Sequence, residues 1–327
     1  MKYIETNSCA PAINLAYEDY FLNGKYLEDD LFMLWRNDPA IVVGKFQNTL
    51  EEINASFAEA HKIQVIRRIS GGGTVYHDLG NLCFSFILHE TKPEIADKTK
   101  YMRPLIGALS QMGIQAEVTR NGLSVGGKKI SGNAMALHKN RLLFHGTLLF
   151  DTDLEMLTAV LKNSADGITS KGVKSVRSSV TNLKEHLAPE VDIIQFKQDM
   201  KNLLFADAPV EVYTPNQQDL DAIHELVKTK YETWKWNYGS NPNARVERSR
   251  QFPGGVLEIR LDLEKGHIKT CRIKSDLEIL VGISEIEKKL ENVRYTFVDV
   301  RNALSGFDLE KNLGSTSKDD LAQWIVY

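Results

Sequence analysis

Apolar residues near the start of the chain follow the period of an α-helix. Four of them recur every three or four positions after Ser8: Ile13, Ala16, Tyr17 and Phe21. Because residues at that spacing share one face, we expect a helix here, with Pro11 in its first turn and an end near Gly24. Further helices are expected at residues 51–62, 97–112, 193–205 and 217–231.

Short apolar runs between these segments predict β-strands. They occupy residues 31–37, 40–46, 64–70, 82–88, 115–121, 128–137 and 142–150. Turns are expected at Gly126–Gly127 and Lys139–Asn140. Because helices and strands mix without strict alternation, we expect an α+β (mixed α/β) fold whose mixed β-sheet is flanked by helices, not a doubly wound parallel sheet.

The pattern changes in two later segments. Residues 164–182 are small, polar and basic, which predicts a long loop of the kind that often forms a lid or binding loop. Residues 234–255 are rich in Asn, Pro, Gly and Arg and indicate a domain boundary. Beyond it, alternation predicts a half-exposed strand that turns at residues 265–266. We therefore expect a large domain at residues 1–240 and a small α+β domain at residues 247–327.

Composition narrows the class of protein. The 327 residues are 43% hydrophobic and 25% charged, with a net charge of −3, which is ordinary for a globular protein and argues against general nucleic-acid binding. Cys9, Cys83 and Cys271 are too few and too scattered for a disulfide framework or a zinc site, which favours a reducing compartment. No apolar run approaches the ~18 residues of a membrane span. The first residues lack a signal-peptide pattern, so we expect a cytoplasmic protein that binds neither membrane nor nucleic acid.

Three consecutive glycines lie between two arginines and a histidine, in the stretch RRISGGGTVYHD at residues 67–78. Glycines after a strand expose backbone N–H groups that can cradle phosphate or carboxylate oxygens. Neither the lysine of a Walker A loop nor the helix of a dinucleotide-binding loop follows. Because side chains alternate along a strand, we expect Arg68 and Ser70, but not Arg67, to point at one ligand. The alternative is a glycine-rich turn flanked by solvated arginines.

The pair His77–Asp78 is similar to pairs in metal phosphohydrolases. Those enzymes need further His and Asp clusters at ligand spacing, and the other histidines of this chain are isolated. We therefore expect His77 to make a polar contact or to have a structural role, and the sequence identifies no metal ligand.

A lysine-bearing strand forms the second candidate site. In the segment KKISGNA, the two-residue period of a strand groups Lys129 with Ser131 and Asn133 on one face and separates it from Lys128. Such a polar row needs a partner if it faces the core. An exposed strand with a solvated lysine is the alternative.

A basic loop forms the third candidate site. Lys171, Lys174 and Arg177 recur every three residues with small residues between them, which suits a mobile clamp for an anion. A set of solvated charges is the alternative. Taken together, the three features predict an enzyme that binds a phosphate-bearing ligand and a carboxylate.

The combination resembles the motifs of lipoate–protein ligases. RRISGGGTVYHDLGN resembles the family's lipoate-binding loop, KKISGNA its catalytic-lysine segment and KGVKSVRSSVTNL its adenylate-binding loop. They occur in the family's order and spacing, and the likeness spans nearly the whole chain, including the small C-terminal domain. The resemblance implies an ATP-dependent, magnesium-assisted reaction that forms lipoyl-AMP from lipoate. A lysine of an acceptor, an E2 lipoyl domain or a glycine-cleavage H protein, would then receive the lipoyl group.

The resemblance also implies roles for individual residues in a monomeric enzyme. Lys129 would be catalytic, and the loop at residues 171–177 would close over the adenylate. The residues that would bind lipoate or nucleotide are Arg68, Ser70, Gly71, Gly72, Gly73, Thr74, Val75, Tyr76, His77, Ser131, Gly132, Lys171, Lys174 and Arg177.

Two positions depart from the family's pattern. Gly122 follows Asn121 where the family often has an aspartate, and Ala136 lies in a region where an arginine is common. The missing carboxylate and cation would weaken metal or phosphate handling, or mark a subgroup with a different acceptor or acyl preference.

Three alternatives share the fold or the chemistry. Octanoyl- and lipoyl-transferases use a cysteine thioester, but Cys83 lies in an apolar strand and the other two cysteines are far from the motifs. Biotin–protein ligase has a different basic loop. A binder of lipoate or lipoyl domains without ligase activity would have no need of Lys129.

Overall fold

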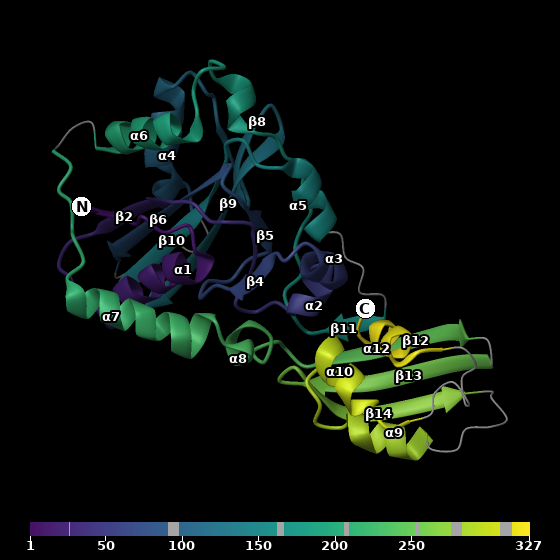
Figure 1. The fold of residues 1–327 in the computed structure, drawn as a ribbon. Helices are drawn as coiled ribbons and strands as arrows, with labels where there is room; N and C mark the ends of the chain where they lie inside the picture. Colours follow the sequence, from purple (N-terminus) through teal and green to yellow (C-terminus); the bar gives the residue numbers. More distant parts are fainter. Residues whose placement is uncertain are drawn as a thin grey trace. The chain divides into compact units, whose positions relative to one another are not determined.

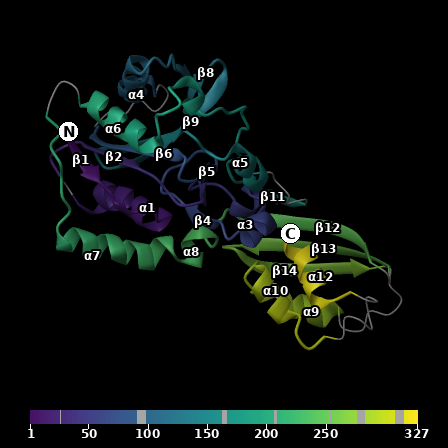
Figure 2. The same ribbon diagram turned by 45° about the horizontal axis from the view of Figure 1, so that its top comes forward.

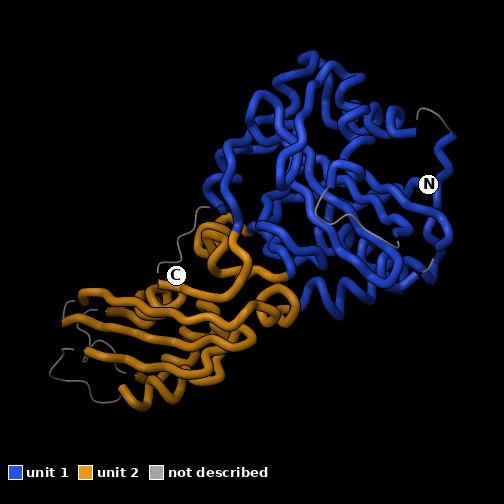
Figure 3. Tube along the Cα trace, turned by 180° about the vertical axis from the view of Figure 1, so that it is seen from behind, with its two compact units in different colours: residues 1–45, 63–161, 175–233 blue, residues 46–62, 162–174, 234–327 orange. Residues whose placement is uncertain are grey.

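The chain forms two compact units, as seen in a computed structural model. The structure describes residues 1–25, 27–90, 98–161, 167–205, 209–252, 255–275, 283–307 and 316–327. Unit 1 consists of residues 1–45, 63–161 and 175–233, and unit 2 of residues 46–62, 162–174 and 234–327 (Figure 3). Two segments that precede the expected boundary therefore group with the C-terminal part of the chain. The assignment of catalysis to residues 1–240 and an accessory role to residues 247–327 stays a prediction.

A seven-stranded mixed sheet forms the centre of unit 1 (Figure 1). In spatial order its strands are β1 (Lys2–Glu5), β2 (Leu31–Trp35), β6 (Asn81–His89), β10 (Arg141–Leu149), β9 (Lys128–His138), β8 (Gly122–Val125) and β7 (Glu117–Thr119). β1 and β2 are parallel, and the other neighbouring pairs are antiparallel. The apolar pattern predicts five of these strands but neither β1 nor β8.

Helices cover both faces of this sheet. In both ribbon views, α4 (Thr99–Gln111) and α6 (Ile193–Leu204) lie on one side of the sheet, and α1 (Pro11–Asp19) and α7 (Gln217–Leu226) lie on the other (Figures 1 and 2). Side chains of β10 alternate accordingly. Phe144 packs in the apolar core with residues of α4 and α6, whereas His145 contacts Glu18 of α1 on the opposite face.

A three-stranded sheet carries the glycine-rich stretch. Its order is β4 (Gln64–Arg67), β3 (Ala40–Val43) and β5 (Val75–His77), with β3 parallel to β4 and antiparallel to β5. Shorter elements complete unit 1: α5 (Leu154–Leu161), the π-helical turns Tyr20–Gly24 and Val227–Tyr231, and the 3₁₀ turn Leu183–His186. The helices expected at the N-terminus and at 193–205 and 217–231 are confirmed.

Unit 2 contains a four-stranded antiparallel sheet. Its order is β11 (Ile168–Ser170), β12 (Ala244–Phe252), β13 (Gly255–Glu264) and β14 (His267–Ser275). Its apolar core includes residues of the helices α9 (Ile283–Leu290), α10 (Phe297–Ala303) and α12 (Lys318–Val326), together with Leu50. The hairpin turn expected at Lys265–Gly266 is confirmed, with positive φ at both residues.

Three expectations for segments that lie wholly or partly in unit 2 are corrected. The supposed linker 234–255 contains α8 (Trp234–Asn237) and β12, whose charged side chains conceal the buried Val246 and Phe252. The first three residues of the supposed loop 164–182 lie outside the described residues, and the rest contains the short strand β11. The helix expected at 51–62 is two helices, α2 (Thr49–Glu52) and α3 (Ala55–Ala60), because Asn54 caps the second of them.

The fold class agrees with the sequence. A large mixed sheet flanked by helices, with a small α+β unit at the C-terminal end, confirms the expected α+β architecture. None of the described helices combines the length and the apolar character that crossing a bilayer requires.

Candidate functional site

The glycine loop between β4 and β5 is organised around one arginine. Arg68 donates hydrogen bonds to the hydroxyl of Ser70 (2.9 Å) and to the carbonyl oxygens of Gly71 and Gly73 (both 2.7 Å). Gly72 has φ +88°, and a Cβ atom there would lie 3.2 Å from the Arg68 guanidinium. The loop therefore needs glycine at this position, and β4 ends earlier than expected because the backbone turns around Arg68.

Both arginines of the stretch are buried. Burial lowers the pKa of Arg68 to about 10; the charge of Arg67 adds to this shift and that of Glu18 opposes it. Arg68 therefore stays charged at neutral pH. Arg67 is also buried and donates to the carbonyl oxygen of Gly44 (2.8 Å), so the alternative of solvated arginines is wrong.

A buried polar network connects the glycine loop to the large sheet. The hydroxyl of Ser70 lies 2.6 Å from Nε2 of His145, whose Nδ1 lies 2.8 Å from the carboxylate of Glu18. Ser85 donates to the same carboxylate, and the Trp35 indole donates to Ser85 (2.8 Å). Sequence reasoning missed Glu18 and His145. The available signal was a charged or polar residue within an otherwise apolar strand or helix, which needs a buried partner.

His77 lies beside this network in a closed environment. Its Nδ1 accepts a hydrogen bond from the side-chain amide of Asn37 (3.0 Å) and lies 3.6 Å from the sulfur of Cys83. Burial, together with the charges of Arg68 and His145, lowers the pKa of His77 to about 3. The imidazole is therefore neutral, which agrees with the structural role expected for it.

Lys129 lies next to a β-bulge in β9. The register between β8 and β9 shifts so that Ser131 pairs with Leu123, and Ile130 is the additional residue. The bulge breaks the two-residue period, so Ser131 faces the apolar core while Lys129 shares a face with Gly132. A Cβ atom at Gly132 would lie 3.5 Å from the Lys129 Nζ atom. The expected row of Lys129 and Ser131 on one face is therefore wrong.

The environment of Lys129 differs from that of its neighbour. Lys129 is half-buried and Lys128 is exposed. Burial lowers the pKa of Lys129, and the nearby charge of Lys98 lowers it further. Within the described residues, no carboxylate forms an ion pair with Lys129. Such an ammonium group is ready to bind an anion.

The backbone of Lys129 is held by the third motif. Its N–H donates to the carbonyl oxygen of Ser179 (2.8 Å), and its carbonyl oxygen accepts from the N–H of Thr181 (3.0 Å). Near the glycine loop, the hydroxyl of Ser175 accepts a hydrogen bond from the backbone N–H of Thr74 (2.9 Å). Residues 175–181 thus contact both the glycine loop and the lysine strand within unit 1.

The three cations of the basic loop belong to different units. Lys171 and Lys174 lie in unit 2, where the Nζ of Lys174 is 3.8 Å from Glu51. Arg177 lies in unit 1 and donates to the carbonyl oxygen of Leu161 (3.4 Å). All three side chains are exposed to solvent. Their exposure is the one expected for solvated charges.

Gly122 has a structural reason to be glycine. A Cβ atom at this position would lie 1.7 Å from the carbonyl oxygen of Ser131, so this backbone has no space for the aspartate common in the family. Ala136 pairs with Leu143 in the sheet and is half-buried.

Two of the three cysteines are poor nucleophiles. Cys83 is fully buried, and burial raises the pKa of its thiol. Burial also raises the pKa of the Cys271 thiol, to about 12. In the part of the chain that the structure describes, no three His, Cys, Asp or Glu side chains are grouped to hold a metal ion.

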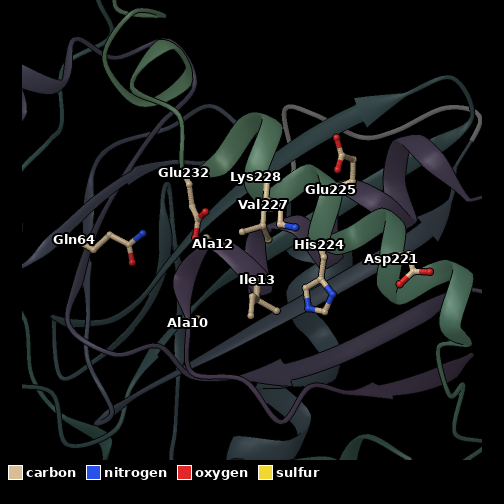
Figure 4. A pocket seen from close by; sticks show the side chains of 10 residues that line it. All are labelled: Ala10, Ala12, Ile13, Gln64, Asp221, His224, Glu225, Val227, Lys228 and Glu232. Atoms are coloured by element: carbon tan, nitrogen blue, oxygen red, sulfur yellow. The ribbon is translucent and has the colours of Figure 1, made fainter.

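A separate cavity of about 510 Å³ lies between α1, α7 and the start of β4 (Figure 4). Its lining includes Ile13, Gln64, His224 and Lys228. None of the predicted site residues lines it, so we assign the chemistry to the glycine loop and Lys129 rather than to this cavity.

Two family models match the chain. The lipoyl protein ligase A/B catalytic domain matches residues 10–205, and the bacterial lipoate protein ligase C-terminus matches residues 241–325. Lipoate–protein ligase 1 of Staphylococcus aureus is 40% identical over 98% of this chain and 98% of that relative. Lipoate-protein ligase LplJ of Bacillus subtilis is 38% identical over 96% of each.

Solved structures show the same likeness. P. falciparum LipL1 in complex with lipoate is 25% identical over 99% of both chains, with a TM-score of 0.58. Lipoate-protein ligase A bound with ATP is 27% identical over 73% of this chain and 98% of that chain, with a TM-score of 0.60. The bipartite ligase of Thermoplasma acidophilum, described with its E2 lipoyl domain, is 26% identical over 73% and 96%, with a TM-score of 0.62. With both family models matched and relatives aligned over nearly its whole length, the chain belongs to the lipoate–protein ligase family.

Proposed function

We propose that this enzyme activates lipoate with ATP and transfers the lipoyl group to a lysine of an acceptor protein. A carboxylate oxygen of lipoate would attack the α-phosphorus of ATP, and pyrophosphate would leave as lipoyl-AMP forms. The amine of the acceptor lysine would then attack the acyl carbon, lose a proton and displace AMP. The observation that carries this proposal is the meeting of the glycine loop, Lys129 and residues 175–181 within unit 1.

Lys129 is the residue that we propose to be catalytic. Its ammonium group has no carboxylate partner among the described residues, and Gly132 beside it leaves room for a ligand. It would donate hydrogen bonds to the phosphate and acyl oxygens of the mixed anhydride, and so stabilise the charge that develops there. Ser131 would support this segment from the core side.

The glycine loop is proposed to bind lipoate and adenine. Residues 71–76 would line both ligands with backbone and apolar groups. Since the guanidinium of Arg68 donates to Ser70 and to loop carbonyl oxygens, it would act by holding the loop in shape as well as by attracting phosphate. His77 is neutral and buried, and it would support the loop structurally.

The basic loop is proposed to close over the adenylate. Lys171, Lys174 and Arg177 are exposed, and their charges suit a phosphodiester. Closure would keep water from hydrolysing lipoyl-AMP before the acceptor arrives.

The proposed substrates, ATP and lipoate, are taken from related solved structures. Lipoate-protein ligase A has been solved with ATP and P. falciparum LipL1 with lipoate, and we propose both as substrates here. Magnesium binds nucleotides mainly through phosphate oxygens and water, so it would enter with ATP. We assign it no protein ligand, because the described residues offer no grouped set of metal ligands.

The acceptor is proposed to be a lipoyl domain of an E2 subunit or an H protein. The T. acidophilum ligase was described with its E2 lipoyl domain, which makes this class the natural candidate. We further propose that the enzyme is a monomer and that residues 1–240 carry out catalysis.

We also propose a location in the cytoplasm, because three free cysteines suit its reducing conditions.

A transferase with a cysteine thioester is the second candidate, and the thiols disfavour it. Cys83 and Cys271 are buried with raised pKa values, so neither supplies a ready thiolate. Cys9 is half-buried. Replacement of each cysteine by serine should leave ligation intact; loss of activity in one variant would favour the thioester.

The two half-reactions test the proposal separately. The full chain, incubated with ATP, magnesium and lipoate, should release pyrophosphate and retain lipoyl-AMP until an apo lipoyl domain is added. A protein that binds lipoate but forms no adenylate, and that also refuses supplied lipoyl-AMP, would be a binder rather than a ligase.

A further inference from the structure

The strands β9 and β10 separate close to Lys129. β10 pairs with β9 as far as Gly146, whereas it pairs with β6 as far as Leu149, so it leaves β9 first. Where the two strands separate, the backbone N–H of Gly132 donates a hydrogen bond to the side-chain hydroxyl of Thr147 (3.0 Å). Lys129 lies on the part of β9 that β10 no longer accompanies.

Residues 179–184, which we call the bridging segment, take the place of β10 beside Lys129. Val180 forms a parallel β-bridge with Lys129. The N–H of Lys129 donates to the carbonyl oxygen of Ser179 (2.8 Å), and its carbonyl oxygen accepts from the N–H of Thr181 (3.0 Å). On its other side Lys129 pairs with β8. The position of the lysine backbone therefore depends on what holds the bridging segment.

Asn182 fastens the bridging segment to the chain that follows β10. Its side-chain oxygen accepts a hydrogen bond from the backbone N–H of Thr152 (3.0 Å), and its side-chain amide donates to the carbonyl oxygen of the same residue (2.9 Å). Asn182 occupies the N-cap position of the 3₁₀ turn Leu183–His186, yet its side chain is used on Thr152. The N–H of Lys184 also donates to the carbonyl oxygen of Phe150 (3.0 Å). The bridging segment thus joins the two separated strands.

We propose that Asn182 is a positioning residue for Lys129, because it fixes the segment to which the backbone of the lysine is hydrogen-bonded. This inference rests on the proposed function for the reaction that Lys129 serves. Loss of the Asn182 side chain would remove a partner from both backbone groups of Thr152 and loosen the bridging segment. Since a displacement of about 1 Å can cost about 10²-fold in rate, a small shift of Lys129 would slow the formation of lipoyl-AMP.

Hydrogen exchange tests the link between Asn182 and Lys129 without reference to activity. In Asn182→Ala, the backbone amides of Lys129 and Thr181 should exchange about tenfold faster than in the wild type, because the bridging segment opens more easily. Mass spectrometry of peptides from the full chain measures both. Asn202→Ala is the matched control and should leave both amides unchanged, because Asn202 is exposed on α6 and accepts its hydrogen bond from Gln198 (2.8 Å).

Kinetics test whether Asn182 acts through Lys129. Pyrophosphate release in the presence of lipoate should show a kcat about tenfold to hundredfold lower for Asn182→Ala, with the KM for ATP changed less than about threefold. In the Lys129→Ala background, Asn182→Ala should cost no further rate, whereas a merely structural role would lower the rate in both backgrounds. Asn182→Asp keeps the oxygen that accepts from Thr152 and loses the donor, so it should show the same pattern if the alanine variant does not fold.

The outcomes separate this inference from the proposed function. Unchanged exchange of the Lys129 amide in both Asn182 variants would overturn the inference, as would a further loss of rate in the Lys129→Ala background. If the wild type forms no lipoyl-AMP while this amide exchanges faster in Asn182→Ala, the proposed function fails and the link between the two residues stands. If Asn182→Ala forms lipoyl-AMP with the kcat of the wild type, only the role of Asn182 is refuted.

Discussion

The Nε2 atom of His145 lies 2.6 Å from the hydroxyl oxygen of Ser70, and both side chains are buried. This contact joins β10 of the large sheet to the glycine loop, two parts of the chain that are 75 residues apart in sequence. Ser70 also accepts a hydrogen bond from Arg68, so the sheet, the serine and the arginine hold the loop together. The conformation of the glycine loop therefore depends on buried hydrogen bonds to the large sheet as well as on its glycines.

A double-mutant cycle tests this connection. Ser70→Ala and His145→Ala should each lower the free energy of unfolding by about 1–3 kcal/mol, because a buried partner is left unsatisfied. Since they share one hydrogen bond, the double variant should lose less than the sum by about 0.5–3 kcal/mol. Urea unfolding measures all three. Ser110 is exposed on α4, so Ser70→Ala combined with Ser110→Ala should be additive. Additivity of the Ser70 and His145 changes would contradict the network.

The two adjacent lysines should differ sharply in activity. Lys129→Ala should slow lipoyl-AMP formation by about 10²–10³-fold, since it removes a donor to the developing charge. Lys128→Ala should have little effect because its side chain is exposed. Pyrophosphate release in the presence of lipoate measures both. Similar losses in the two variants would show that the orientation of this strand is misassigned.

Restoring the family's aspartate at position 122, or placing any other side chain there, should destabilise the protein. Gly122→Ala should destabilise the protein by about 3 kcal/mol, because its Cβ would meet the carbonyl oxygen of Ser131. A Cβ atom at Gly107 on α4 would have no atom within 4 Å, so Gly107→Ala should be neutral or stabilising by up to about 1 kcal/mol. Thermal unfolding compares the two. A Gly122→Asp protein as stable and active as the wild type would refute this explanation.

His77 should make the fold sensitive to acid. Its pKa is lowered to about 3, so between that value and about 6.5 the unfolded chain binds a proton here and the folded chain does not. Stability from this group is complete above pH ~6.5 and is lost as the pH falls. From pH ~7.5 to pH ~5 the wild type should lose about 2 kcal/mol more unfolding free energy than His77→Gln. Urea unfolding at both pH values gives the difference, and parallel losses would argue against a buried neutral imidazole.

Local pattern was sufficient for much of the fold. Continuous apolar runs predict β2, β6 and β10, which are buried on both faces, and helical spacing predicts α1 and α6. β12 escaped prediction because arginine and glutamate occupy its exposed positions and leave few apolar residues visible. β1 and β8 have four residues each, and neither was predicted.

The site was less accessible to sequence reasoning. Consecutive glycines and a lysine segment indicate anion binding, but a β-bulge at Ile130 is a tertiary feature that the alternating pattern does not reveal. Glu18 and His145 reach the glycine loop only once helix and sheet have packed.

The intact mass of an apo lipoyl domain tests the central claim most directly. After incubation with the full chain, ATP, magnesium and lipoate, the acceptor should gain the mass of one lipoyl group, with an equal amount of AMP released. Omission of ATP should prevent the gain, and supplied lipoyl-AMP should restore it. An acceptor of unchanged mass in the complete mixture and with supplied lipoyl-AMP, for both an E2 lipoyl domain and an H protein, would contradict the account.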